Sequence, residues 1–106
     1  MLKGILGVLI LSLLAARDDY GYALVLRLRE AGLDDIAEGT VYPALTRCER
    51  SSWLRSYYVP SPSGPSRKYY QVTSDGMAEL TRALQSWTHL SRLVNDLSSK
   101  ELRNEP

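Results

Sequence analysis

The stretch Glu38–Glu49, with the sequence EGTVYPALTRCE, decides the fold because it has the pattern of a short amphipathic helix. Val41, Leu45 and Cys48 recur at helical spacing and form one apolar stripe. Pro43 would remove a backbone hydrogen bond deep inside a helix, so it belongs near the helix start. The sequence therefore predicts a helix that begins within the first three residues of this stretch and buries its apolar stripe.

The polar face of this predicted helix is unusual because it is not the Lys/Glu mixture of an ordinary solvated face. It offers hydroxyl groups, an aromatic ring and guanidinium groups, which is the chemistry that binds phosphates and base edges in a DNA groove. We therefore expect DNA contacts from Thr40, Tyr42, Pro43, Thr46, Arg47 and Arg50.

The segment before this helix predicts a second helix. Asp18 and Asp19 are candidate N-cap residues, and apolar residues then recur at helical spacing until Gly32. The connection from Leu33 to Ala37 is short. Two helices joined by a few residues, the second with a polar and aromatic face, are typical of a helix-turn-helix.

After Glu49 the pattern changes to two strand-like runs, Trp53–Val59 and Lys68–Thr73, which are rich in aromatic and β-branched residues. Between them, Pro60–Ser66 has the composition of a loop. A hairpin next to a helix-turn-helix is a wing, and we expect Arg67 and Lys68 to bind phosphate or the minor groove. The alternative is an ordinary surface hairpin.

The first segment, Met1–Ala16, has the superficial pattern of a signal peptide, with one lysine and a long apolar run. The run is too short to span a membrane, and removing it would take the longest apolar helix from a small domain. We therefore expect a cytoplasmic protein without a membrane partner. A helix that is apolar nearly all the way round must be buried on more than one side.

Thr73, Ser74 and Asp75 are candidate N-cap residues for a long last helix, along which apolar residues recur at steps of three and four as far as Leu97. The polar tail 98–106 is expected to fray. The predicted organisation is a DNA-binding domain over residues 1–73, a dimerisation helix over 74–97 and a flexible tail.

Such a long apolar stripe predicts a homodimer formed by the first and last helices. The expected interface residues are Leu6, Leu9, Ile10, Leu84, Trp87 and Val94. An indole is a poor choice for a tight helix seam, because its N–H needs a partner. We therefore expect a planar aromatic effector to bind beside Trp87, Leu84, Leu6 and Ile10. The alternative is that Trp87 only packs the seam.

The composition excludes several other classes of protein. The chain of 106 residues has 44% hydrophobic and 24% charged residues, which is typical of one ordinary globular domain. Residues 40–70 hold five basic side chains against Glu49 alone, a net +4, so the rest carries −3 to give the overall +1. This local basic patch favours a polyanionic partner. The single cysteine, Cys48, and the single histidine, His89, form no catalytic or metal-binding pattern, so we expect no enzyme, metal or cofactor.

Three motifs in this order resemble the PadR family of bacterial transcriptional regulators: YGYAL at 20–24, EGTVYPAL at 38–45 and RKYYQVT at 67–73. The resemblance extends from Leu2 to Leu97. It implies a dimer whose interface is formed by the first and last helices, as in PadR regulators. Because one helix follows the predicted wing, the chain is similar to the smaller PadR subgroup, which has no additional C-terminal domain. Ser86–Thr88 is similar to the segment with which lactococcal multidrug-sensing members hold flat aromatic compounds. Ser52 departs from a frequent glycine, Cys48 replaces a usual leucine, and the wing has three prolines and fewer arginines.

Together these patterns predict an α+β winged helix-turn-helix of the order α-α-α-β-β-α with a long C-terminal dimerisation helix. The expected function is a sequence-specific DNA-binding regulator, a ligand-responsive repressor that binds an inverted-repeat operator as a homodimer. The alternative is a winged-helix protein-interaction module that does not bind DNA, since a fold alone does not determine function.

Overall fold

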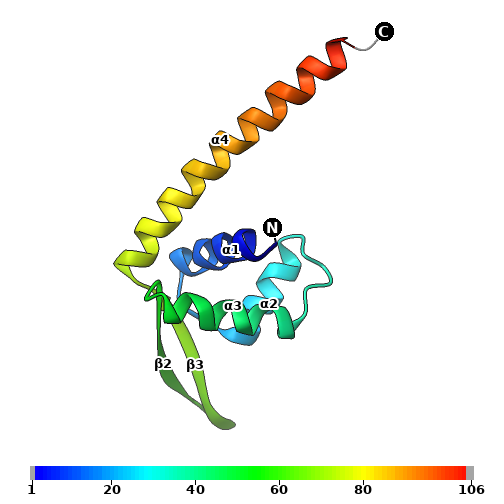
Figure 1. Ribbon diagram of the computed structural model, residues 1–106. Helices are drawn as coiled ribbons and strands as arrows, with labels where there is room; N and C mark the ends of the chain where they lie inside the picture. Colours follow the sequence, from blue (N-terminus) through cyan, green and yellow to red (C-terminus); the bar gives the residue numbers. More distant parts are fainter. Residues whose placement is uncertain (1, 105–106) are drawn as a thin grey trace.

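The computed structural model describes residues 2–104 and has the predicted α+β winged-helix architecture (Figure 1). In chain order the elements are α1 (Leu2–Ala16), β1 (Asp19–Tyr20), α2 (Gly21–Glu30), α3 (Glu38–Arg50), β2 (Leu54–Ser61), β3 (Gly64–Val72) and α4 (Ser74–Asn104). The helix predicted over 38–49 is confirmed. The short strand β1 was not predicted.

The three strands form one antiparallel sheet in the order β1-β3-β2. In it, Asp19 and Tyr20 pair with Tyr70 and Tyr69, so the prediction that Asp18 or Asp19 caps the following helix is wrong. The helix α2 begins at Gly21 instead, and its N-cap residue Tyr20 makes no side-chain capping bond. Asp19 is only 8% exposed, and its buried carboxylate is compensated by a hydrogen bond of 3.1 Å that it accepts from Arg27.

The wing is a longer hairpin than the sequence predicts. The prediction of a loop over Pro60–Ser66 is wrong, because β2 and β3 continue into it and only Pro62 and Ser63 form the turn. Proline is tolerated in strands where no ladder hydrogen bond is lost. Pro60 lies in an edge strand at an irregularity between Val59 and Ser61, and Pro65 lies in β3 beyond the reach of β1.

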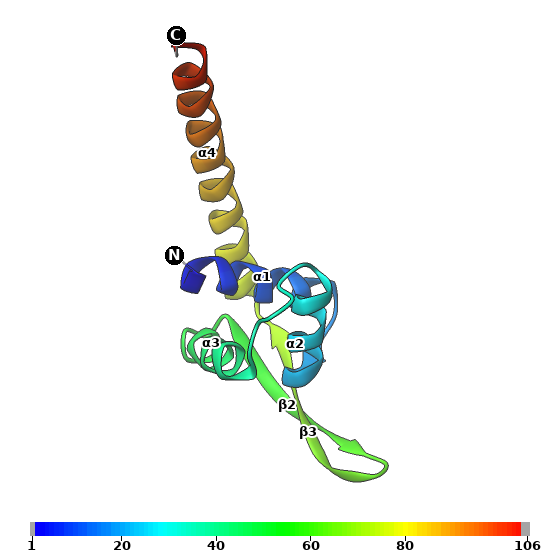
Figure 2. The ribbon, with the colours of Figure 1, turned by 90° about the vertical axis from the view of Figure 1, so that its right-hand side faces the viewer.

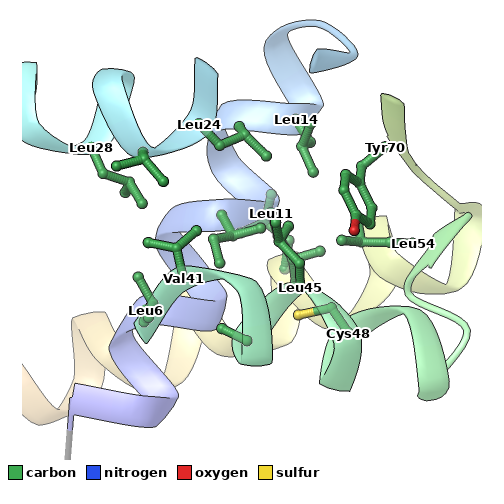
Figure 3. Close-up of a cluster of buried hydrophobic side chains, with 14 residues drawn as sticks. Leu6, Leu11, Leu14, Leu24, Leu28, Val41, Leu45, Cys48, Leu54 and Tyr70 are labelled. Carbon is green, nitrogen blue, oxygen red and sulfur yellow. The ribbon is translucent and has the colours of Figure 1, made fainter. Parts of the chain in front are cut away.

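One core lies between the helices and the sheet (Figure 3). The predicted stripe Val41, Leu45 and Cys48 of α3 is buried there, together with Ala44. The other helices contribute Leu6, Ile10, Leu11 and Leu14 from α1, Leu24, Val25 and Leu28 from α2, and Leu80 from α4. Full burial of one such leucine or valine stabilises the fold by about 1.5–3 kcal/mol.

The apolar helix α1 is not fully covered within the single chain, because Ile5, Val8, Leu9 and Leu13 remain partly exposed. Within residues 2–104, no helix combines the length and the hydropathy needed to cross a membrane.

The last helix, α4, projects away from the rest of the chain, and the wing extends on the opposite side (Figures 1 and 2). It is 31 residues long and gives the molecule its extents of 65 × 29 × 20 Å. The prediction that the chain frays from Ser98 is wrong for the part that is described, because the helix continues to Asn104. Glu105 and Pro106, which belong to the same predicted tail, lie outside the described residues.

A compact joint connects the end of α3 to the start of α4. The Trp53 N–H donates to the Cys48 carbonyl, and the Trp53 carbonyl accepts from the Thr73 N–H, both at 3.0 Å. The Thr73 hydroxyl donates to the Ser52 carbonyl at 2.6 Å and accepts from the Gly76 N–H at 3.0 Å. The direction of α4 is therefore fixed relative to α3 by hydrogen bonds between segments about twenty residues apart.

Candidate nucleic-acid interface

The outer surface of α3 is a continuous polar stripe opposite the core. Gly39, Pro43, Thr46 and Arg50 follow one another at steps of four, three and four residues, which places them on one line of a helix. All four are exposed. Since Pro43 has no N–H, the Gly39 carbonyl loses its helical partner, and its exposed position leaves this group to solvent.

All six residues that the sequence assigned to the DNA face of this helix are exposed, namely Thr40, Tyr42, Pro43, Thr46, Arg47 and Arg50. Among the side chains that the structure describes, neither Arg47 nor Arg50 forms an ion pair. Their guanidinium groups are therefore available to an anionic partner. The Thr46 hydroxyl donates to the Tyr42 carbonyl at 3.1 Å.

Tyr42 differs from the other five because its ring leans onto α2. A methyl group placed on Gly21 would overlap with the ring edge, and it would lie 3.1 Å from Cζ and 3.2 Å from the phenol oxygen. Partial burial, followed by the nearby charge of Glu38, raises the pKa of the Tyr42 phenol. This ring is 40% exposed, so it both packs between two helices and offers an edge to the surface.

Lys68, which is predicted to bind phosphate or the minor groove, forms an ion pair within its own chain. Its Nζ donates to Glu49 Oε1 of α3 at 3.1 Å, and it lies 5.2 Å from the centroid of the Tyr70 ring. The second carboxylate oxygen of Glu49 accepts a bond of 2.6 Å from the Ser56 hydroxyl. The bond to Glu49 raises the pKa of the Lys68 amine, and the bond from Ser56, with a further contribution from Lys68, lowers the pKa of Glu49.

Arg67 lies on the opposite face of the hairpin, because neighbouring residues in a strand point to opposite faces. Its Cζ lies 4.5 Å from the centroid of the Tyr20 ring. Tyr20, Tyr69 and Tyr57 are opposite one another on the three strands, with centroid distances of 5.5 and 5.9 Å. Arg67 therefore packs on the Tyr20 end of this row of three aromatic rings, and its side chain remains exposed.

An open concavity of about 620 Å³ lies where β1, α2, α3 and β3 meet. Its lining residues are Tyr20, Gly21, Tyr22, Tyr42, Arg67, Lys68 and Tyr70. Four of the seven are tyrosines and two are cations, so the surface suits a partner with negative charge.

Sequence reasoning missed Tyr20, Gly21, Tyr22 and Tyr70 as part of this surface. Three of these four residues belong to the YGYAL motif at 20–24, in which two tyrosines flank a glycine. It also missed Asp18, which accepts hydrogen bonds from the Tyr57 hydroxyl at 2.5 Å and from Gln71 at 3.1 Å. Asp18 thereby anchors the outer face of the wing to the segment before α2.

The residues predicted for the dimer interface separate into two groups. Leu6 and Ile10 are 1% and 0% exposed within the single chain, so neither has surface left for a partner or a ligand. The prediction that Leu6 and Ile10 belong to the dimer interface and to the effector site is therefore wrong. Leu84, Trp87 and Val94 are exposed on the projecting part of α4, and Leu9 is partly exposed.

No group of three or more His, Cys, Asp or Glu side chains within residues 2–104 is arranged to hold a metal ion. Cys48 is buried, and burial raises the pKa of its thiol. It is therefore a packed core side chain.

Residues 10–82 match the transcriptional regulator PadR-like family, and these residues include α2, α3 and the whole wing. The chain belongs to the PadR-like family. A crystal structure of a Streptococcus transcriptional regulator is 40% identical, with a TM-score of 0.84 over 92% of this chain and 95% of that chain. A PadR-like transcriptional regulator from Bacillus cereus is 37% identical, with a TM-score of 0.81 over 92% and 94%.

An uncharacterised protein of Lysinibacillus sphaericus is 30% identical over 97 residues, which are 90% of this chain and 89% of that protein. Membership of the PadR-like family identifies this protein as a transcriptional regulator of the DNA-binding winged-helix type. The family match includes both α3 and the β2–β3 wing.

Proposed function

We propose that this protein is a ligand-responsive repressor that binds an inverted-repeat operator as a homodimer. The observation that carries the proposal is the exposed face of α3 beside the wing, on the side of the molecule away from α4 (Figure 2). A helix with free guanidinium groups and exposed hydroxyl groups is suited to the major groove, and an adjacent hairpin is suited to the flanking backbone.

Within this surface, Thr46, Arg47 and Arg50 are the residues proposed to reach base edges and phosphates from α3. Arginine binds guanine edges and phosphates with paired hydrogen bonds. Arg67 is the proposed phosphate contact of the wing, because its guanidinium group is exposed and stacks on Tyr20.

The proposed dimer rests on the exposed apolar stripe of α4. Trp87, Leu90, Val94 and Leu97 recur at steps of three, four and three, and Trp87 and Val94 are 51% and 54% exposed. An apolar stripe on a helix that projects from its domain needs a partner surface. Leu9 of α1 is also partly exposed and is proposed to belong to the same interface. A two-fold axis through it would present two α3 helices to two half-sites of opposite direction.

The proposed effector is a planar aromatic molecule held at Trp87. Two indoles near a two-fold axis provide stacking faces for an apolar or cationic ring system. A ligand that prefers one spacing of the two α3 helices shifts the DNA-binding equilibrium by its difference in affinity for the two spacings. The joint at Ser52, Thr73 and Gly76 would carry a change in α4 to α3.

Fluorescence anisotropy of a labelled random duplex, titrated with the purified protein at several salt concentrations, tests the DNA-binding part. We expect the logarithm of the affinity to fall linearly with the logarithm of the salt concentration, with a slope of about −0.9 per phosphate contacted. A protein-interaction module would show no salt-dependent binding to duplex. Sequencing DNA fragments that the protein selects would then reveal whether the operator is an inverted repeat.

The effector part is tested by Trp fluorescence in a Trp53→Phe background, so that Trp87 is the only indole. Titration with planar aromatic dyes and phenolic acids should quench the emission, and the same compounds should release DNA. If Trp87→Ala leaves compound-induced release intact, the indole only packs the seam.

A further inference from the structure

The Glu49 carboxylate connects α3 to both strands of the wing. Its Oε2 accepts from Ser56 of β2 at 2.6 Å, and its Oε1 accepts from Lys68 of β3 at 3.1 Å. Both oxygens of one carboxylate in the last turn of α3 are therefore bound by the hairpin. Charge-assisted hydrogen bonds of this kind are short and stronger than neutral ones.

The surroundings of Lys68 favour a role inside the protein. Its ammonium group has Glu49 on one side and the ring of Tyr70 on the other, and Tyr70 is itself 6% exposed and part of the core. Moving Lys68 to a phosphate would leave the Glu49 carboxylate without its cation next to a polyanion. The neighbouring Arg67 has no such internal anion within the described residues, and its guanidinium group is exposed.

We propose that Lys68 is a positioning residue that fastens the wing to α3 through Glu49, and that the phosphate contact of the wing is made by Arg67. This deepens the proposed DNA-binding function and rests on it. Arg67 and Lys68, which lie on opposite faces of β3, therefore have different roles in this proposal. This proposal replaces the prediction that Arg67 and Lys68 both bind phosphates.

The decisive comparison keeps the net charge constant. The double variant Glu49→Gln with Lys68→Met has the same net charge as the natural protein, because it removes one negative and one positive group. If Lys68 fastens the wing, the double variant binds duplex more weakly by roughly threefold to tenfold, but its salt slope stays within about 0.3 of the natural value. If Lys68 contacts a phosphate, the slope becomes less steep by about 0.9. That second result would overturn the proposal.

Two single variants serve as controls for the slope. Arg67→Met should make the slope less steep by about 0.9, because one phosphate contact is lost. Lys100→Met removes the same charge from the far end of α4 and should leave the slope unchanged. Lys68→Arg should restore most of the affinity lost in Lys68→Met, since a guanidinium group also pairs with a carboxylate.

A second measurement needs no DNA. Hydrogen exchange of the hairpin amides should be faster in the double variant than in the natural protein, while the amides of α1 should exchange at an unchanged rate. Equal exchange rates in the hairpin would overturn the positioning role even if the protein bound no DNA. Loss of salt-dependent binding in the natural protein would instead overturn the proposed function, so the two failures are distinguishable.

Discussion

The ring of Tyr42 occupies the space that a side chain on Gly21 would need. Gly21 is the first residue of α2, and Tyr42 lies in the first half of α3, so this contact joins the two helices beside the concavity that both residues line. The absence of a Cβ at Gly21 is what lets the ring edge of a large aromatic residue of α3 approach α2 so closely. The position of the ring is therefore set by a residue 21 positions earlier in the chain.

Gly21→Ala should displace this ring. Because Tyr42 is a partly exposed side chain that can rotate outward, we expect the free energy of unfolding to change by less than about 1 kcal/mol. DNA affinity should fall by roughly tenfold, which corresponds to about 1.4 kcal/mol. Anisotropy titrations and urea unfolding give the two quantities. In a Tyr42→Ala background the same substitution should have no further effect on binding, and an additive loss there would contradict the mechanism.

Gly76→Ala should destabilise the protein much more. A Cβ at Gly76 would overlap with the Trp53 carbonyl oxygen and lie 2.8 Å from Val72 Cγ2, and backbone gives way less easily than a side chain. We expect a loss of about 1–3 kcal/mol or more in the free energy of unfolding. Gly7→Ala in α1 is the matched control, because a Cβ there has no neighbour within 4 Å in the chain. A similar loss in both variants would refute the argument.

Ser52 has a φ of 65°, a left-handed conformation that is unfavourable for residues with a Cβ. Ser52→Gly should raise the free energy of unfolding by up to about 1 kcal/mol, since relief of strain outweighs the added freedom of the unfolded chain. Ser52→Val should lower it by about 1–2 kcal/mol, because β-branched residues fit this region worst. Thermal unfolding of the three proteins should give the order Gly, Ser, Val, and any other order would contradict the prediction.

The wing should loosen in acid. The pKa of Glu49 is lowered below its ordinary value of 4.5 by the bond from Ser56, with a further contribution from Lys68. A lowered pKa means that this contribution to stability is present above pH 4.5 and is lost as the pH falls through the folded-state pKa. The pKa of Lys68 is raised above 10.5, so its contribution is fully present below that pH and is lost only at higher pH.

Urea unfolding of the natural protein and of Glu49→Gln, measured from about pH 3 to about pH 8, tests this linkage. The natural protein should be the more stable of the two above pH 4.5, and the difference should vanish toward the acid end. A difference that does not depend on pH would show that the ionised carboxylate is not the stabilising group.

Val94→Glu should break the proposed dimer. A charge placed in a buried apolar seam without a partner costs several kcal/mol. Sedimentation velocity at micromolar concentration should show a dimer for the natural protein and monomers or aggregates for the variant. Gln85→Glu, on the opposite side of α4, introduces the same charge and should leave the dimer intact. A folded monomer of the natural protein would count against the whole arrangement.

The sequence by itself determined the elements whose periodicity is clear. The stripe Val41, Leu45 and Cys48 predicted α3 and its buried side correctly, because polar and apolar residues alternate there at the helical period. The same reasoning predicted that the six polar residues of α3 are exposed. It also identified the hairpin and the long last helix from residue types and turn signals.

Only the tertiary structure decided which residues of α1 are buried, how the wing strands pair and which residue Lys68 contacts. An all-apolar helix has no periodicity that distinguishes its sides, so only packing showed that Leu6 and Ile10 face the core of their own chain. Two of the three wing prolines lie in strands, Pro60 at an irregularity of the edge strand β2 and Pro65 in β3 beyond the end of β1, and these positions depend on how the three strands pair. Strand alternation separates Arg67 from Lys68, but only the approach of Glu49 decides that Lys68 is the residue with an internal partner.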